Sequence, residues 1–323
     1  METPLVSVSL VAYNASAYIK DAIEGCLMQQ TSFPFEIIIH DDASQDETAQ
    51  IILDYVSKYP DKIIPIIQTE NQFSKGYEIN AKLVIPQARG KYIAFLEADD
   101  YWIDPLKLQK QVDFMEKHPG ISMCFTATKE IESSGSNKVT IKRYRNHDSV
   151  CSTEDVILMG GRLVDMGSAV VRKSIYDNVP NWYHYSQIWD NTVPLLALTH
   201  GKIQYLNEIT AVYRYNVPGS WTQKNVKDYK KRAGNIRRKL TLLDGFNEGT
   251  NHQYYKLIMR LTRLISIGFL LLIDPQEEGF KKYYNRLNLP LKFEYKVFNF
   301  IGSYRLWERY RQVLRLFRKI KQI

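Results

Sequence analysis

The chain has 323 residues, of which 45% are hydrophobic, so it can form one large domain with an appendage or two domains. Its cysteines, Cys26, Cys124 and Cys151, lie far apart without a C-x-x-C spacing, which argues against disulfides and zinc and favours a reducing compartment. The N-terminus lacks a basic start and a cleavage site, and the longest uncharged apolar run, residues 264–273, is shorter than the roughly 20 residues of a membrane span. We therefore expect a cytoplasmic protein that is not integral to a membrane.

Charge is divided unevenly along the chain. Residues 1–222 contain 20 basic and 27 acidic side chains, whereas residues 223–323 contain 23 basic and 8 acidic ones, giving net charges of −7 and +15. Such asymmetry is typical of a protein in which one part performs chemistry and the other binds a polyanion, either an acidic lipid surface or a nucleic acid.

Apolar runs alternate with helix-period segments over the first 130 residues. Strands that are apolar on both faces and separated by helices predict an α/β fold with a mostly parallel sheet covered by helices. The predicted strands are residues 5–12, 35–40, 62–68, 92–98 and 121–127.

Further along the chain, residues 129–146 predict a hairpin with a Ser/Gly turn, and a helix is expected to open at Ser152. Two more strands are predicted at residues 167–173 and 202–215, with a helix from 189 to Gly201 between them. We divide the chain into a domain of residues 1–222, with halves 1–127 and 128–222, and a basic, mostly helical region of residues 223–323.

Ligands of such sheets bind at the carboxyl ends of the strands, and polar residues follow the first, second and fourth predicted strands. After the fourth strand, Glu97 and Asp99 are two apart and point to one side if the strand continues, with Asp100 at the turn. Carboxylates this close favour Mg²⁺ or Mn²⁺. The structural alternative is an acidic turn before a helix, in which Asp104 serves as the N-cap ahead of Pro105.

The segment "HDDASQDET" after the second strand has a similar double interpretation. Ser44 and Glu47 fit a capping box, which needs no ligand, but it leaves Asp41 and Asp42 unexplained. A carboxylate at a strand end can accept hydrogen bonds from a nucleobase, and Tyr13 offers a stacking face.

Three motifs together, "VSLVAYNASAYIKDAIEGCLMQQ", "FEIIIHDDASQDET" and "GKYIAFLEADDYW", resemble the nucleotide-sugar half of family 2 glycosyltransferases with the GT-A fold. The resemblance covers residues 5–127 strongly and extends more weakly to about residue 222. It implies that Tyr13 and Asp42 hold the nucleobase with Asp41 beside them, and that residues 97–100 are the D-x-D-type segment. In that segment Asp99 would meet the ribose or the metal, and Asp100 would meet the metal that bridges the diphosphate.

Glu97 stands where the family commonly has Asp, which puts a direct metal role for this residue in doubt. Asn71 and Asn80 match positions that line the donor pocket. The full set that the resemblance implies for nucleotide-sugar binding is Ala12, Tyr13, Asn14, Asp41, Asp42, Asn80, Glu97, Ala98 and Asp99. The metal, Mn²⁺ or Mg²⁺, would supply the positive charge that a diphosphate needs in a region of net charge −7.

The resemblance also implies a general base, Asp190, in the segment where the family has a Glu-Asp pair, although Trp189 replaces the first acid. The alternative is that Asp190 caps its helix. With one base and no evident second carboxylate as nucleophile, a single displacement that inverts the anomeric centre is the economical mechanism. The acceptor would meet Gly167, Ser168, Trp189 and Trp221, of which Trp221 could equally be a hydrophobic anchor.

The end of the chain, residues 304–323, places apolar residues at helical spacing among Arg and Lys. Such a helix either lies in an anionic membrane interface or docks on protein. A second basic stretch, residues 224–239, favours the membrane, so that the protein would be peripheral to the inner face of the cytoplasmic membrane.

We therefore expect a metal-dependent, inverting glycosyltransferase that moves a sugar from a nucleotide-sugar donor, expected to be UDP-linked, to a saccharide or lipid-linked acceptor in cell-surface polysaccharide or glycolipid synthesis. The alternatives are a non-catalytic carbohydrate-binding protein of the same fold and a metal-dependent nuclease or nucleotidyltransferase. We expect no nucleic-acid partner, because a glycine-rich phosphate loop is absent after the first strand; a G-x-G-x-x-G dinucleotide motif is absent there too.

Overall fold

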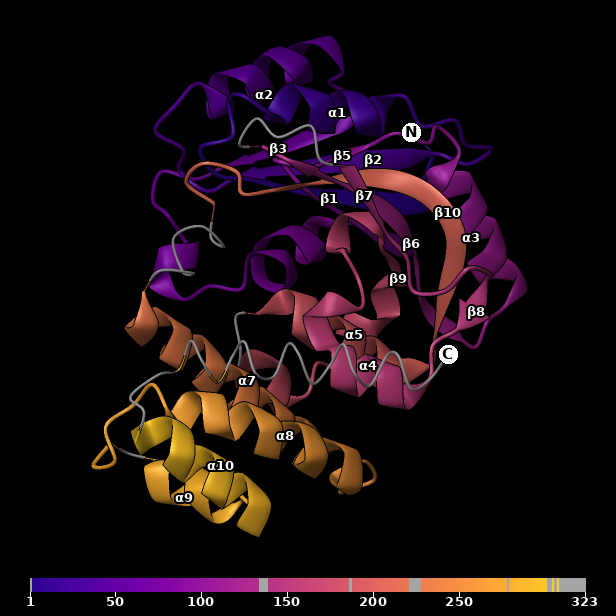
Figure 1. Ribbon diagram of the computed structural model, residues 1–323. Helices are drawn as coiled ribbons and strands as arrows, with labels where there is room; N and C mark the ends of the chain where they lie inside the picture. The colour runs from indigo at the N-terminus through magenta and orange to yellow at the C-terminus, as the bar shows by residue number, and fades with distance from the viewer. Residues whose placement is uncertain are drawn as a thin grey trace. The chain divides into compact units, whose positions relative to one another are not determined.

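The structure is a computed structural model that describes residues 2–133, 139–185, 188–220, 228–277, 279–300, 304 and 307. The chain divides into two compact units, residues 1–220 and 221–323 (Figure 1). The predicted boundaries after residues 127 and 222 stay predictions about the division of function.

The first unit is built on one mixed sheet, whose strands in the described residues have the spatial order β3-β2-β1-β4-β9-β6-β10-β5, with β7 paired to β6 and β8 to β10. The bounds are β1 Val6–Ala12, β2 Phe35–Asp41, β3 Ile63–Ile67, β4 Tyr92–Glu97, β5 Tyr101–Trp102, β6 Ile121–Glu132, β7 Val139–Lys142, β8 Ser149–Val150, β9 Val170–Arg172 and β10 Lys202–Tyr215.

The pairing confirms the predicted strands and their mostly parallel arrangement. Strands β1 to β4 are parallel to one another, β6 is parallel to β10, and β9 runs antiparallel between β4 and β6. Strands β6 and β7 pair antiparallel, as the predicted hairpin requires, and the predicted Ser/Gly turn between them falls on residues 134–138, which lie outside the described residues.

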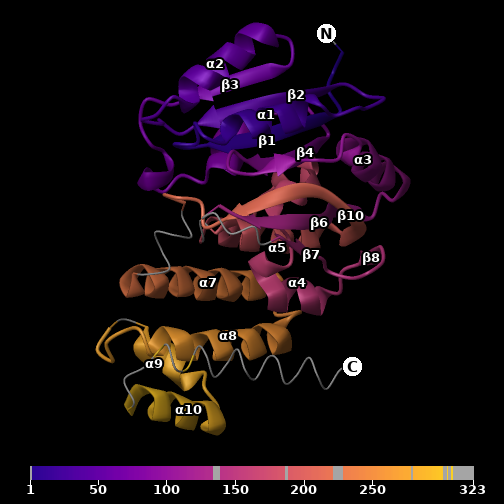
Figure 2. The same ribbon diagram turned by 45° about the horizontal axis from the view of Figure 1, so that its top comes forward.

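Helices cover both faces of this sheet (Figures 1 and 2). On one face the core joins alternate residues of β1, β2 and β4, such as Val8, Ile37 and Ala94, to apolar residues of α1 and α3. Successive side chains of a strand point to opposite faces, so Phe95 and Glu97 of β4 lie on the other face of the sheet. On that face α5 packs against β6 and β10. The helices of this unit are α1 Ile19–Leu27, α2 Thr48–Lys58, α3 Lys107–Lys117, α4 Thr153–Met159 and α5 Trp189–His200.

The structure corrects both predicted caps. Helix α2 begins after Glu47 without a side-chain cap. The Ser44 hydroxyl oxygen accepts from the Asn14 amide at 2.8 Å instead, while the hydroxyl donates to Asp41. Helix α3 begins after Leu106, so Asp104 is not its N-cap. The Asp104 carboxylate accepts from the Leu106 amide at 2.9 Å and pairs with Lys110 of the helix at 2.9 Å. The predicted start of α4 at Ser152 is confirmed, and the Ser152 side chain caps the helix by accepting from the Asp155 amide at 3.0 Å.

The second unit is helical over its described residues, with α7 Tyr229–Gly249, α8 Tyr255–Leu270, α9 Phe280–Asn285 and α10 Leu289–Phe300. Its core includes Leu240, Phe269, Tyr283 and Tyr295. Among the described residues, none of the helices has the length and apolarity needed to cross a bilayer. The amphipathic helix predicted for residues 304–323 lies outside the described residues except at two positions.

Candidate active site

Three carboxylates meet at the carboxyl end of β4, as the sequence predicts. Glu97 is the last residue of the strand, and Asp99 and Asp100 lie in the turn before β5. One oxygen from each lies within 4.8 Å of the others. We call these three residues the acidic trio. Three hard oxygen donors at this separation fit a Mg²⁺ or Mn²⁺ ion, which prefers carboxylate ligands.

The acidic trio carries a concentrated negative charge in a buried place. Burial, together with the neighbouring Asp99, raises the pKa of Glu97 from 4.5 to about 8. Burial also raises the pKa of Asp99, and burial with the charges of Asp99 and Glu97 raises that of Asp100 well above its ordinary value. The site therefore favours either protons or a cation.

Arg214, at the end of β10, holds the turn of the acidic trio. Its amide donates to the Asp100 carboxylate at 2.8 Å, and its guanidinium donates to the backbone oxygen of Asp99 at 2.9 Å and forms an ion pair with Asp21. The guanidinium also lies 4.3 Å from the centre of the Tyr101 ring. Arg214 could not be predicted as a site residue, because nothing in the sequence near it indicates a contact with a turn more than 100 positions earlier.

The predicted acceptor residues Gly167 and Ser168 lie next to the acidic trio, since a Cβ atom on Gly167 would lie 3.8 Å from the Asp100 carboxylate. The Trp102 indole donates to the Gly167 oxygen at 2.7 Å, and Gln111 donates to the Ser168 oxygen at 3.0 Å. The Ser168 side chain is fully buried and donates to the backbone oxygen of Asp165 at 2.7 Å. These bonds fix the backbone beside the trio, whereas contact of either residue with an acceptor stays a prediction.

The start of α5 brings Trp189 and Asp190 to the acidic trio. Trp189 hydrogen-bonds to Glu97 through its side chain and packs edge-on against Phe95, with ring centres 5.3 Å apart. The charge of Asp190 is one cause of the raised pKa of Glu97. The fold thus joins two segments that are about 90 residues apart in sequence.

The helix-cap alternative for Asp190 does not match the geometry. Ile188 is the N-cap of α5, so Asp190 lies inside the first turn. Its carboxylate accepts from the Asn191 side chain at 3.0 Å. A Cβ atom on Gly161 would lie 2.4 Å from the Asp190 carboxylate, so the absence of a side chain at residue 161 makes room for this group.

Two further residues near the acidic trio were missed by the sequence analysis. The charge of Asp165, which is bonded to Lys142 and Thr128, contributes to the raised pKa of Glu97. Burial and the charges of the trio raise the pKa of the Tyr213 phenol. Both residues lie outside recognisable motifs, so only the fold brings them to the site.

Asp41 and Asp42, at the end of β2, are both buried and both engaged with the protein itself. The Asp41 carboxylate accepts from the amide and hydroxyl of Ser44. The two oxygens of Asp42 accept from the amides of Gln72 and Phe73 at 2.7 and 3.0 Å. In this structure these carboxylates therefore order the loops around the predicted nucleobase site.

Tyr13 and Asn14 follow β1, the central neighbour of β2 and β4. The Tyr13 side chain is exposed, as a stacking surface requires. Asn14 adopts a φ of 49° and accepts from the Gln45 amide at 2.7 Å, which ties the first two motifs together. Ala12 and Ala98 are buried at the ends of β1 and β4, where small residues leave space at the sheet edge.

The two predicted donor-pocket asparagines are also placed by hydrogen bonds. Asn80 is buried and accepts from the Ser9 hydroxyl of β1. Asn71 donates to the backbone oxygen of Asp42 at 3.1 Å. Both residues support the segment between β3 and β4, and contact with a donor stays a prediction. Trp221 lies outside the described residues.

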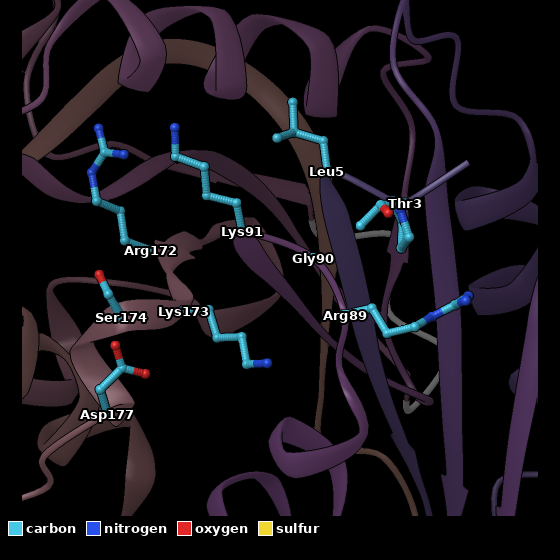
Figure 3. A pocket seen from close by; sticks show the side chains of 10 residues that line it. Thr3, Leu5, Arg89, Gly90, Lys91, Arg172, Lys173, Ser174 and Asp177 are labelled. Carbon is cyan, nitrogen blue, oxygen red and sulfur yellow. The ribbon is translucent and has the colours of Figure 1, made fainter. Parts of the chain in front are cut away.

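A cavity of about 580 Å³ lies at the opposite end of β4 from the acidic trio (Figure 3). Its cationic side chains are already bonded within the protein: Arg89 pairs with Glu36, Lys91 with Glu116, Arg172 donates to backbone oxygens and Lys173 donates to the Ala88 oxygen. Because the cavity lies at the start of β4 and the acidic trio at its end, the cavity is separate from the candidate active site.

A comparison of the sequence with models of known protein families identifies the family of this chain. The model of glycosyl transferase family 2 matches residues 7–180, more than half of the chain, including the acidic trio. The chain belongs to this family. Membership in family 2 favours a glycosyltransferase over the nuclease and nucleotidyltransferase alternatives.

Relatives support the same membership. The uncharacterized protein Rv1520 of Mycobacterium tuberculosis is 36% identical over 225 residues, which are 67% of this chain and 60% of that protein. The match therefore spans less than two thirds of the relative. The Escherichia coli protein WfaP, named as a UDP-Glc:alpha-D-GlcNAc-diphosphoundecaprenol beta-1,3-glucosyltransferase, is 40% identical over 112 residues, which are 35% of this chain and 41% of WfaP.

Solved structures show the fold of this family 2 protein. Residues 1–349 of S. aureus TarS in complex with UDP-GlcNAc align with a TM-score of 0.55 and 16% identity, covering 95% of this chain and 91% of that one. The Pyrobaculum calidifontis mannosyltransferase PcManGT, in complex with GDP-Man and Mn²⁺, aligns with a TM-score of 0.51 and 15% identity, covering 94% and 85%. The predicted GT-A fold class is confirmed.

Proposed function

We propose that this family 2 protein is a metal-dependent, inverting glycosyltransferase that uses a nucleotide-sugar donor, UDP-linked, and a saccharide or lipid-linked acceptor in cell-surface polysaccharide or glycolipid synthesis. One observation supports this proposal above the others. The fold brings Asp190 to the face of the sheet that carries Glu97, so the candidate base lies beside the candidate metal ligands.

Asp99 and Asp100 are the residues that would hold the cation, with Glu97 positioned by Trp189 beside them. A bound Mn²⁺ or Mg²⁺ would neutralise the diphosphate and stabilise the negative charge that develops on it as the sugar departs. Tyr13, Asn14 and the loops ordered by Asp41 and Asp42 would hold the nucleoside at the ends of β1 and β2.

Asp190 would remove the proton from the acceptor hydroxyl, whose oxygen attacks the anomeric carbon while the bond from that carbon to the diphosphate oxygen breaks. A retaining mechanism would need another carboxylate as nucleophile. Among the described residues, Asp165 is occupied by Lys142 and Thr128, and Glu97 is bonded to Trp189. Direct displacement with inversion is therefore the mechanism that the arrangement supports best.

The nucleotide and the acceptor are proposed from the relatives. TarS was solved with UDP-GlcNAc, and WfaP is named for transfer from UDP-Glc to a diphosphoundecaprenol-linked sugar. TuaG of Bacillus subtilis, named as a putative teichuronic acid biosynthesis glycosyltransferase, is 40% identical over 113 residues, which are 35% of this chain and 42% of TuaG.

The test is a thermal-shift screen of UDP- and GDP-sugars with and without Mn²⁺, followed by assays of transfer and of donor hydrolysis. A nucleotide sugar that binds the folded chain raises its melting temperature. Asp190→Asn is expected to keep the metal-dependent shift and lose transfer. A protein that only binds carbohydrate would show the shift with no turnover in the parent chain, and absence of any nucleotide-dependent shift would contradict the proposal.

A further inference from the structure

Helix α10 of the second unit exposes large apolar side chains to solvent. Leu289 is 83% exposed, Phe293 70% and Phe300 93%. The three residues are the most exposed large apolar side chains in the described part of the chain, and we call them the α10 stripe. Exposure of this kind on neighbouring residues marks an interaction surface.

The spacing of these residues places them on one line. At about 100° per residue, the three side chains fall within an arc of about 40°. Tyr295, Leu291 and Phe298 of the same helix pack into the core of the unit, on the opposite side. The helix is thus apolar on two faces, of which the described residues of its own unit cover only one.

Basic residues lie along the same edge. Lys296 is separated from the α10 stripe by about 20° and Lys292 by about 60–100°, whereas Glu294 lies further round the helix and accepts from the Trp307 indole at 2.7 Å. Residues 223–323 as a whole carry a net charge of +15. An apolar line beside lysines in a strongly cationic region matches the interface of an anionic bilayer.

We propose that the α10 stripe inserts into the surface of a bilayer that contains anionic phospholipid, with the helix parallel to the membrane plane. The helix has 12 residues and a length of about 18 Å, too short to span the roughly 30 Å hydrocarbon core. A second copy of the chain is the less favourable occupant, because each copy brings the same +15 to the contact. The proposal goes beyond sugar transfer and does not depend on it.

The experiment measures sedimentation of the full chain with vesicles of phosphatidylcholine and phosphatidylglycerol in equal parts, and with vesicles of phosphatidylcholine alone. Phe293→Ser combined with Phe300→Ser is expected to weaken binding to the anionic vesicles by about 10-fold or more. Lys292→Glu combined with Lys296→Glu is expected to weaken it by about 10-fold and only on anionic vesicles.

The matched control is Val139→Ser combined with Ile141→Ser, a pair of exposed apolar residues on β7, which is expected to change binding less than about twofold. Because Phe293, Phe300 and the control residues are exposed, these variants should melt like the parent chain. Lys292 is half-buried and lies 5.2 Å from the centre of the Tyr284 ring, so Lys296→Glu alone, on an exposed residue, accompanies the lysine pair. Undiminished vesicle binding by the phenylalanine variant would overturn the proposal, whatever residues 304–323 contribute. A dimer in the parent chain that this variant dissociates, with no vesicle binding by either, would assign the stripe to a second copy instead.

Discussion

The backbone N–H of Arg214 donates to the carboxylate of Asp100 over 2.8 Å, and the same residue's guanidinium donates to the backbone oxygen of Asp99 over 2.9 Å. These bonds join the end of β10 to the turn after β4. They explain how three mutually repelling carboxylates stay together, because a positive group fixes the turn while leaving carboxylate oxygens for a cation. The position of the acidic trio therefore depends on a strand that is distant in sequence.

Asp100→Asn separates the metal role of this residue from its structural role. The amide oxygen of Asn can still accept from the Arg214 N–H, so the melting temperature without metal should stay within about 2 °C of the parent. Affinity for Mn²⁺, measured by titration calorimetry, and metal-dependent transfer should both fall by about 100-fold. The control is Asp113→Asn on the exposed side of α3, which should leave both unchanged. Full activity in Asp100→Asn would contradict the metal assignment.

The raised pKa of Glu97 makes the stability of the chain depend on pH, and a bound metal should remove this dependence. Because its pKa is about 8 in the folded chain and 4.5 ordinarily, the folded chain binds more protons between these values, so stability should fall as pH rises from about 5 to 8. Mn²⁺ replaces those protons and should remove the fall. Melting temperatures across this range, with Mn²⁺ and with a chelator, measure the effect. Parallel curves under the two conditions would show that the trio does not bind the ion.

The strands and the acidic trio could be predicted because local sequence determines them. Runs such as residues 35–40 are apolar on both faces only if the strand is covered on both sides, and carboxylates after β4 must reach the sheet edge. Caps were less predictable. Ser44 satisfies the pattern of a capping box, but its hydroxyl oxygen accepts from the Asn14 amide of another loop at 2.8 Å, and no helix amide is capped by it.

The rest of the candidate site is set by tertiary contacts that leave no local pattern. Arg214, Asp165 and Tyr213 stand in unremarkable sequence, and each reaches the acidic trio only because β9 and β10 pack where they do. Asp42 shows that a side chain can also have a structural role that its motif does not indicate, because its carboxylate accepts two backbone N–H groups of the next loop. Its contact with a nucleobase stays a prediction.

Gly161→Ala tests whether the position of Asp190 matters for transfer. The added Cβ would lie 2.4 Å from one carboxylate oxygen of Asp190 and 2.7 Å from its Cγ, so the side chain must move. A displacement of about 1 Å is expected to lower kcat by about 100-fold while donor binding is retained. Gly120→Ala is the control, because a Cβ there meets nothing within 4 Å and should leave kcat unchanged. If Gly161→Ala keeps the parent's kcat, Asp190 is not the base.

Lys107 is a fully buried cation that supports the residues behind the acidic trio. Its ammonium donates to Gln111 at 2.8 Å and lies 4.4 Å from the centre of the Trp102 ring, and these two residues hold the Ser168 and Gly167 backbone. Burial lowers the pKa of Lys107 from 10.5 to about 7. Between these values the unfolded chain binds more protons than the folded one, so this residue makes stability rise with pH.

Lys107→Met should remove that dependence, since methionine fills a similar volume without a charge. Relative to the parent, the variant is expected to be most stable at and below pH of about 7, by up to a few kcal/mol, and to lose this advantage towards pH of about 10. Denaturant unfolding of both chains across this range measures the difference, with Lys117→Met on the exposed end of α3 as the control. A stability difference that does not change with pH would show that Lys107 keeps its proton throughout, held by the Trp102 ring and Gln111.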